Sequence, residues 1–305
     1  MKITVNNISI EIEDSGDRND GDGNNGKKRP VVLLIMGLGM QLIDWPDEMV
    51  NLLIAAGFRV IRHDNRDSGL SQRFEHIPQR SFLWQKIRFR LGLPIRAPYS
   101  IQDMADDAVG VLDALHIPRA HIIGASMGGM IAQRLVANHP ERALSLVSIM
   151  SSSGARHLPQ PKPDVVAALL SKPASTREED LIAHQLKLLQ LVASPHERLA
   201  KDELAQHMKI ALSRGGYHPK GILRQVMAIM ADSQRADLLA QVYCPTLVVH
   251  GKDDPLLPIA CGEDTAKRIT GAEFLPIPQM GHTFPQTFMQ AMTEKIIPFL
   301  HGIHY

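Results

Sequence analysis

A short apolar run passes into a helix-like segment at HIIGASMGGM, residues 121–130, and the residue at the junction is a serine. Ser126 stands between Gly124 and Gly128, which gives the pattern G-x-S-x-G. A strand that turns directly into a helix forces the residue at the turn into a strained backbone conformation. Neighbouring segments come so close there that only glycine fits on either side. The pattern therefore predicts a serine at the tip of a sharp turn, facing the positive end of a helix.

The rest of the chain repeats this alternation of strand and helix. Its apolar runs are continuous, as in parallel strands that are covered on both faces. Helical patterns separate them, for example from near Trp45 to Gly57, and from a capping box at Ser100 and Asp103 onwards. We expect an α/β fold with a mostly parallel, doubly wound sheet of about eight strands. The expected strands are a hairpin over 2–13 and runs at 31–36, 58–63, 121–125, 143–150, 245–250 and 273–278.

Residues 152–236 break this rhythm, because they have helical periodicity and no convincing strand. We expect a core domain of residues 1–151 and 237–305, with residues 152–236 inserted into it as a helical cap. Residues 14–28 are rich in Gly, Asp and Asn, and we expect them to form a surface loop.

Composition excludes several classes of function. The net charge of +1 gives no field that would attract nucleic acid. The two cysteines, Cys244 and Cys261, are expected to be buried thiols in a reducing compartment. There is no signal-peptide pattern, no run of the ~18 apolar residues that a membrane span needs, and no metal-ligand motif. We expect a cytoplasmic protein without a metal, with His301 and His304 on its surface; the oligomeric state stays open.

Two further signals follow strands late in the chain. HGKDDP begins at the end of the run 245–250, and MGH follows the last run. A carboxylate at a strand exit can hold an imidazole in one tautomer, and Asp254 is preferred over Asp253 because Pro255 fixes the turn behind it. His282 comes after both other candidates, which gives the order Ser, Asp, His along the chain. The sequence predicts that Ser126, Asp254 and His282 act together as nucleophile, orienting carboxylate and base.

An acyl-transfer site also needs two backbone N–H groups that stabilise the developing oxyanion. One is expected from Met127, the residue after the serine. The other is expected from Leu38 in MGLG, residues 36–39, whose glycines let the backbone approach a substrate.

These motifs resemble those of the α/β-hydrolase superfamily over nearly the whole chain. DNRDSGLS, residues 64–71, resembles the D-x-R-x-x-G-x-S turn of that superfamily, and Trp45 and Pro46 stand where many members have them. IMGLGMQLIDWPDEM, IIGASMGGMIAQ and MGH are most similar to the branch that contains aclacinomycin methylesterase and many bacterial carboxylesterases. Many relatives have His-Gly where this chain has Met36-Gly37. The resemblance implies an enzyme without a cofactor that hydrolyses carboxylic esters.

The expected substrate is a small to medium, largely apolar ester that passes through an acyl-enzyme intermediate. Gly37, Met40, Trp45 and Met280 are expected to bind it, because they lie in or beside these loops and methionine adapts to irregular apolar shapes. The same three reacting residues would also suit an enol-lactonase, a C–C bond hydrolase, a peptidase or a perhydrolase. A ligand-binding or signalling protein on this scaffold is a further alternative.

Residues 72–99 form a long basic link that also contains Trp84, Ile87 and Phe89. We expect this link to fold over the rim of the site with its charges in water. The alternative is a basic amphipathic element that touches membranes or anionic, lipid-like substrates.

Overall fold

The computed structural model describes residues 1–16, 29–78, 81–169, 171–197, 199–232 and 234–303. In this part of the chain, one sheet of eight strands has the order β1-β2-β4-β3-β5-β6-β7-β8. β1 and β2 pair antiparallel, as do β2 and β4, and every later pair is parallel. The strands are β1 (Lys2–Val5), β2 (Ile8–Asp14), β3 (Val31–Ile35), β4 (Arg59–His63), β5 (Ala120–Ala125), β6 (Ala143–Ile149), β7 (Thr246–Gly251) and β8 (Glu273–Ile277).

Two apolar layers cover the sheet. On one face, α1 (Asp47–Ala55) and α11 (Gln286–His301) pack their buried side chains against the strands. On the other face, α3 (Ile101–Ala114) and α4 (Met127–Asn138) do the same. Strands β3, β5 and β6 are buried along their whole length, which explains their continuous apolar sequence.

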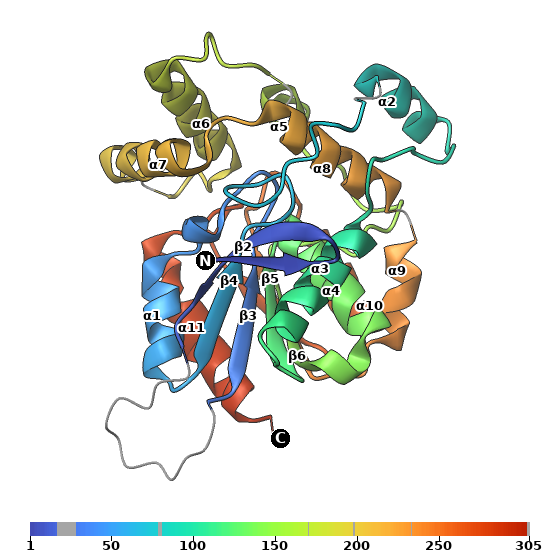
Figure 1. The fold of residues 1–305 in the computed structure, drawn as a ribbon, viewed down its shortest axis with the longest axis vertical. Helices are drawn as coiled ribbons and strands as arrows, with labels where there is room; N and C mark the ends of the chain where they lie inside the picture. Colours follow the sequence, from blue (N-terminus) through green and yellow to red (C-terminus); the bar gives the residue numbers. More distant parts are fainter. Residues whose placement is uncertain (17–28, 79–80, 170, 198, 233, 304–305) are drawn as a thin grey trace.

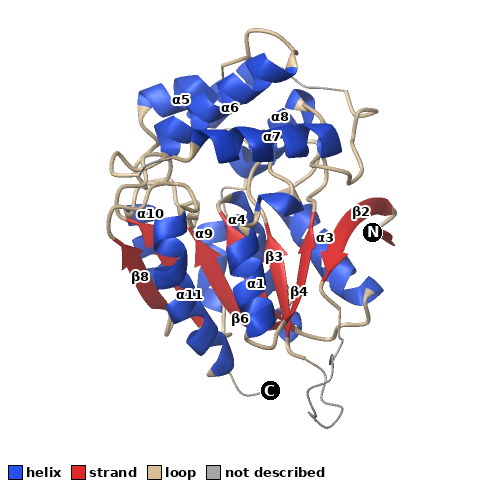
Figure 2. Ribbon diagram, turned by 90° about the vertical axis from the view of Figure 1, so that its left-hand side faces the viewer, coloured by secondary structure: helices blue, strands red, loops and turns tan. Residues whose placement is uncertain are grey.

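Four helices form a separate layer over the carboxyl ends of the strands (Figure 2). They are α5 (Pro163–Leu169), α6 (Glu178–Val192), α7 (Lys201–Gly215) and α8 (Pro219–Ala231). A further helix, α2 (Phe82–Arg90), lies beside α8 at the edge of this layer (Figure 1). The remaining helices are α9 (Arg235–Leu238) and α10 (Ala260–Arg268), with short 3₁₀ turns at Leu42–Asp44, Pro140–Arg142 and Leu239–Gln241.

The fold predicted from the sequence is confirmed. The strand bounds agree with the expected runs, and the capping box at Ser100 and Asp103 starts α3. Helix α2 was not expected inside the basic link 72–99. Most of the loop predicted at 14–28 lies outside the described residues. None of the described helices is both long and apolar enough to cross a membrane.

Candidate active site

Ser126 sits at the turn between β5 and α4, at the carboxyl edge of the sheet. Its backbone has φ 54° and ψ −120°, a conformation that residues with a side chain rarely adopt. The turn is held by the Ser126 N–H, which donates to the Ile149 carbonyl at 3.0 Å. The strain predicted from the sequence at this serine is confirmed.

The glycines on either side of Ser126 are required by sterics. A Cβ atom on Gly124 would collide with the Gly128 carbonyl, and a Cβ atom on Gly128 would collide with the Ile35 carbonyl at the end of β3. Backbone atoms of α4 and β3 therefore occupy the space that any larger residue would need. Tight packing of the turn against its neighbours therefore explains why both positions are glycine.

His282 connects the serine to a carboxylate. Its Nε2 lies 2.9 Å from the Ser126 Oγ, and its Nδ1 lies 2.7 Å from the Asp254 Oδ2. His282 comes from the loop between β8 and α11, and Asp254 follows β7, so three strand ends converge on one point. The structure thus joins the three predicted residues in one chain of hydrogen bonds. In the tautomer that suits this geometry, Nδ1–H donates to the carboxylate and Nε2 accepts from the hydroxyl.

The Asp254 carboxylate is fully buried and fixed in orientation. Its second oxygen accepts hydrogen bonds from the N–H groups of Leu256 at 2.9 Å and Leu257 at 2.7 Å. Neighbouring Asp253 is exposed. The choice between the two aspartates therefore agrees with the geometry.

A second histidine that the sequence analysis did not single out lies next to Asp254. The Nε2 of buried His250 is 2.7 Å from the Leu257 carbonyl and 3.5 Å from the Asp254 oxygen that faces His282. Burial is the main reason that the pKa of His250 lies below its ordinary value. Its position near the end of β7, as the first residue of HGKDDP, is the signal that could have drawn attention to it.

The loop after β3 lies directly against the serine. A Cβ atom on Gly37 would be 3.3 Å from the Ser126 Cβ and 3.8 Å from its Oγ. The neighbouring N–H of Leu38 and the N–H of Met127 have no hydrogen-bond partner among the described residues. The two predicted oxyanion donors thus stand on the two segments that flank Ser126.

A glutamine from α8 holds this loop from the outside. The Gln225 Oε1 accepts a hydrogen bond from the Gly39 N–H at 2.8 Å. The Gln225 Nε2 donates to the Arg66 carbonyl at 2.8 Å and to the Ser68 Oγ at 3.0 Å. Asn65 adds a bond to the Met36 carbonyl at 2.8 Å. Sequence reasoning missed this role of Gln225, although a polar pair within ILRQVMAIM, residues 222–230, is an unusual signal in an apolar helix face.

Two ion pairs tie the same helical layer to the turn after β4. Arg214 of α7 lies 2.7 Å from the Asp64 carboxylate, and Arg224 of α8 holds both oxygens of Asp67 at 2.7 and 2.8 Å. Burial alone would raise the pKa of Asp67, but the Arg224 guanidinium and the Tyr99 hydroxyl outweigh it, so the pKa lies below its ordinary value. Asp67 is therefore an anion that is matched by a buried cation.

The loop that carries His282 is also held by the helical layer. The His282 N–H donates to the Val192 carbonyl at the end of α6 at 2.7 Å. The Thr283 hydroxyl donates to the Glu197 carboxylate at 2.6 Å. A Cβ atom on Gly281 would collide with the backbone of the segment after α6.

The residues expected to bind substrate have different environments. Gly37 touches Ser126, and the Met40 side chain is 38% exposed in the same loop. Trp45 and Met280 are 1% and 0% exposed and belong to the apolar cluster under the loops. A direct contact between these two side chains and a substrate stays a prediction.

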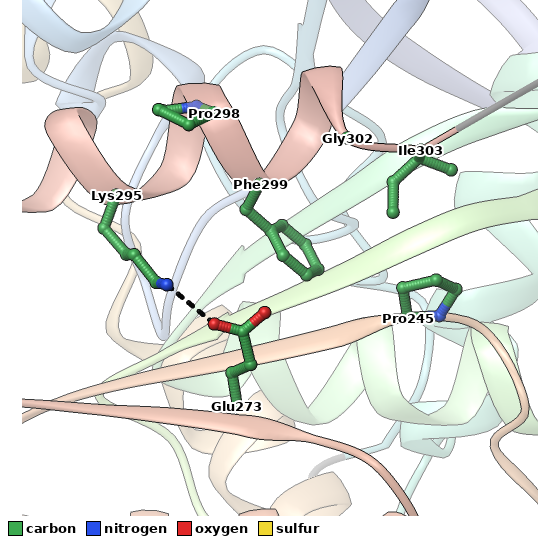
Figure 3. Close-up of a pocket in the computed structure, with 7 residues that line it drawn as sticks. All are labelled: Pro245, Glu273, Lys295, Pro298, Phe299, Gly302 and Ile303. Atoms are coloured by element: carbon green, nitrogen blue, oxygen red, sulfur yellow. Dashed lines mark ion pairs between the residues drawn. The ribbon is translucent and has the colours of Figure 1, made fainter.

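Within the described residues, no group of three or more His, Cys, Asp or Glu side chains is arranged to hold a metal ion. A pocket lies at the opposite, amino-terminal edge of the sheet, where the 2.7 Å ion pair between Lys295 and Glu273 crosses it (Figure 3). Ser126, His282 and Asp254 do not line this pocket.

The site combines a strained serine after a parallel strand with a histidine and an aspartate from later strand exits. This arrangement is typical of α/β hydrolases. The family described as the alpha/beta hydrolase fold matches residues 30–285, and the chain belongs to that family.

Individual relatives agree with this assignment. Rhodomycin D methylesterase DauP of Streptomyces sp. (strain C5) is 29% identical over 96% of this chain and 95% of its own length. Putative carbamate hydrolase RutD of Caulobacter sp. (strain K31) is 25% identical over 92% of this chain and 94% of its own length. Among solved structures, the enol-lactonase from Burkholderia xenovorans LB400 superposes with a TM-score of 0.72 at 21% identity, over 99% of this chain and 100% of that chain. The names of the two sequence relatives support a hydrolase, and the solved structure supports the fold.

Proposed function

We propose that the protein is a serine-dependent carboxylic-ester hydrolase that acts on small to medium, largely apolar esters. The observation that carries the proposal is the continuous hydrogen-bonded array from the Ser126 Oγ through His282 to the buried Asp254 carboxylate, at 2.9 and 2.7 Å. The relatedness to a methylesterase adds support. The cytoplasmic location expected from the sequence stays a prediction.

The first half of the proposed reaction forms an acyl-enzyme. The Ser126 Oγ attacks the ester carbonyl carbon while its proton passes to the His282 Nε2, and Asp254 stabilises the resulting imidazolium. The N–H groups of Leu38 and Met127 hold the negative oxygen of the tetrahedral intermediate. When the intermediate collapses, the C–O bond to the alcohol breaks and His282 gives its proton to the departing oxygen.

Water completes the second half. It attacks the acyl carbon, gives its proton to His282, and forms a second tetrahedral intermediate on the same two N–H groups. Collapse of that intermediate releases the carboxylic acid and returns the proton to Ser126. The array needs neither a metal nor a cofactor for these steps.

We assign the choice of substrate to residues 152–236, acting as a cap over the site. Helices α5 to α8 lie above the carboxyl edge where Ser126 sits (Figure 2). We expect an apolar acyl or alcohol group to contact methionines of this cap, such as Met208 and Met227, because methionine adapts to irregular apolar shapes.

The proposal is tested with a panel of nitrophenyl esters of increasing acyl length. The wild-type protein should release nitrophenol in a burst, and a fluorophosphonate should label Ser126. Ser126→Ala should lose turnover and labelling while its circular dichroism spectrum stays unchanged. Ser15→Ala, which removes an exposed hydroxyl that accepts a hydrogen bond from the Val60 N–H away from the array, is the matched control and should keep its activity. Wild-type turnover in Ser126→Ala would refute the proposal. Hydrolysis of a carbamate but of no ester would also contradict it and would assign the site to carbamate substrates.

A further inference from the structure

Helix α2 exposes large apolar side chains and buries a polar one. The side chain that faces inward is a glutamine, Gln85, which is 5% exposed. The side chains of Leu83, Trp84 and Leu91 are 68%, 64% and 68% exposed. A surface helix normally buries its apolar stripe, so this arrangement leaves an apolar face without a partner in the described chain.

Four of the exposed apolar residues form one arc, while Phe89, which is 47% exposed, lies on the side of Gln85. Leu83, Trp84, Ile87 and Leu91 fall within about 100° of each other at helical spacing, on the side opposite Gln85. The loop that follows extends the apolar area with Leu93, which is 46% exposed.

Cations border this arc on both sides. At the same helical spacing, Lys86 and Arg90 lie along one edge of the arc and Arg88 lies along the other. Exposed Arg96 follows in the loop, and the Arg156 guanidinium approaches Gly92. Residues 81–97 contain no Asp or Glu, although the whole chain has a net charge of only +1.

Two hydrogen bonds connect helix α2 to the loop that follows it. The Gln85 Oε1 accepts a hydrogen bond from the Arg96 N–H at 3.0 Å, and the Arg88 Nε donates to the Pro94 carbonyl at 2.8 Å. Helix α2 packs against α8 and projects from the edge of the molecule (Figure 1). These hydrogen bonds do not involve the apolar side chains of the arc, which remain exposed.

We propose that this arc and its cations, here named the α2 surface, dock the protein onto an anionic lipid membrane. Apolar side chains would enter the boundary between headgroups and acyl chains, while the long stems of Lys86, Arg88 and Arg90 let their charges reach lipid phosphates. A second copy of this chain is the weaker occupant, since a two-fold contact through the α2 surface would bring the same cations together. The protein would bind the membrane surface without spanning it, and this binding is a property separate from ester hydrolysis.

The first test uses the full chain with vesicles of phosphatidylcholine alone, or with about one third phosphatidylglycerol. The protein should float with the anionic vesicles, bind neutral ones much less, and be released at high salt. The chain has two tryptophans, and Trp45 is 1% exposed while Trp84 is 64% exposed. The emission of Trp84 should therefore shift to shorter wavelength on binding and be quenched by brominated acyl chains.

Two variants separate the apolar and charged contributions. Trp84→Ser/Leu91→Ser should lose binding, and Lys86→Gln/Arg90→Gln should weaken it by about 10-fold or more. The matched controls are Tyr243→Ser, which removes an 82% exposed aromatic ring elsewhere, and Lys2→Gln/Lys267→Gln, which removes the same charge from other surfaces. Both controls should bind like the wild type.

Hydrolysis of a short, water-soluble ester should be unchanged in all four variants, so the proposed function and the membrane proposal can fail separately. Equal binding to neutral and anionic vesicles, or no binding to either, would overturn the proposal. A dimer in light scattering that Trp84→Ser/Leu91→Ser converts to monomer would also overturn it and assign the α2 surface to self-association.

Discussion

Gln225 of α8 holds Gly39 of the loop after β3 through a 2.8 Å hydrogen bond, although the two residues are 186 positions apart. Gln225 is completely buried, and its amide also reaches two groups of the turn after β4. A residue of the helical layer thus fixes the backbone next to Leu38, the proposed oxyanion donor. We regard Gln225 as a positioning residue for the reaction.

Replacing Gln225 by leucine should lower kcat by about 10- to 100-fold while KM changes much less, because the Leu38 N–H would lose its alignment with the developing oxyanion. Steady-state kinetics on a nitrophenyl ester measures this split. Gln206→Leu, at an exposed position of α7, is the matched control. An unchanged kcat in folded Gln225→Leu protein would show that the loop keeps its shape without this bond.

The two neighbouring aspartates offer a direct comparison. Asp254→Asn should reduce kcat by about 10⁴-fold, because an amide cannot stabilise the imidazolium and favours the wrong tautomer of His282. Asp253→Asn should leave kcat within about two-fold, because that side chain is exposed. Rates measured near pH 8 with matched protein concentrations test both. Equal losses in the two variants would contradict the assignment of the carboxylate.

Gly128 should tolerate no side chain. In Gly128→Ala the new methyl group would overlap the Ile35 carbonyl, and we expect a loss of about 3 kcal/mol or more in the free energy of unfolding. Gly271→Ala is the control: it has φ +77° and no atom within 4 Å, so only backbone strain of about 1 kcal/mol is added. Guanidinium unfolding curves measure both, and equal effects would refute the steric explanation.

Two buried histidines should make the fold acid-sensitive. Burial lowers the pKa of His63 to about 4, and burial followed by the charge of His301 lowers that of His121 to about 4. Between these values and the ordinary value of about 6.5, the unfolded chain binds more protons than the folded one. The free energy of unfolding should therefore fall as the pH is lowered from about 6.5 to 4, by up to ~3 kcal/mol for each histidine.

Denaturant titrations at several pH values measure this slope. His121→Gln should make it shallower by the contribution of this one histidine, up to ~3 kcal/mol between pH 6.5 and 4, whatever that variant does to stability at pH 8. His76→Gln, at an exposed position, should leave the slope unchanged. A slope that is the same in His121→Gln and the wild type would contradict the explanation.

The sequence predicted those features that local patterns encode. The strands, the turn at Ser126 and the order of Asp254 and His282 follow from apolar runs and from motifs a few residues long. Pairs such as Gln225 with Gly39 could not be predicted, because they depend on how a separate helical layer lies on the sheet. Helix α2 was missed for a different reason. Most of its apolar side chains are exposed, so the sequence lacks the buried apolar stripe from which a surface helix is predicted.

The ties between the helical layer and the sheet also limit how this protein can be re-engineered. Exchanging residues 152–236 for those of a relative would remove Arg214, Arg224 and Gln225 in a single step. Two carboxylates, Asp64 and Asp67, would then be left in the interior with no counter-ion. In a working chimera, residues 152–236 must therefore be exchanged together with the turn after β4, so that each buried carboxylate keeps a matching cation.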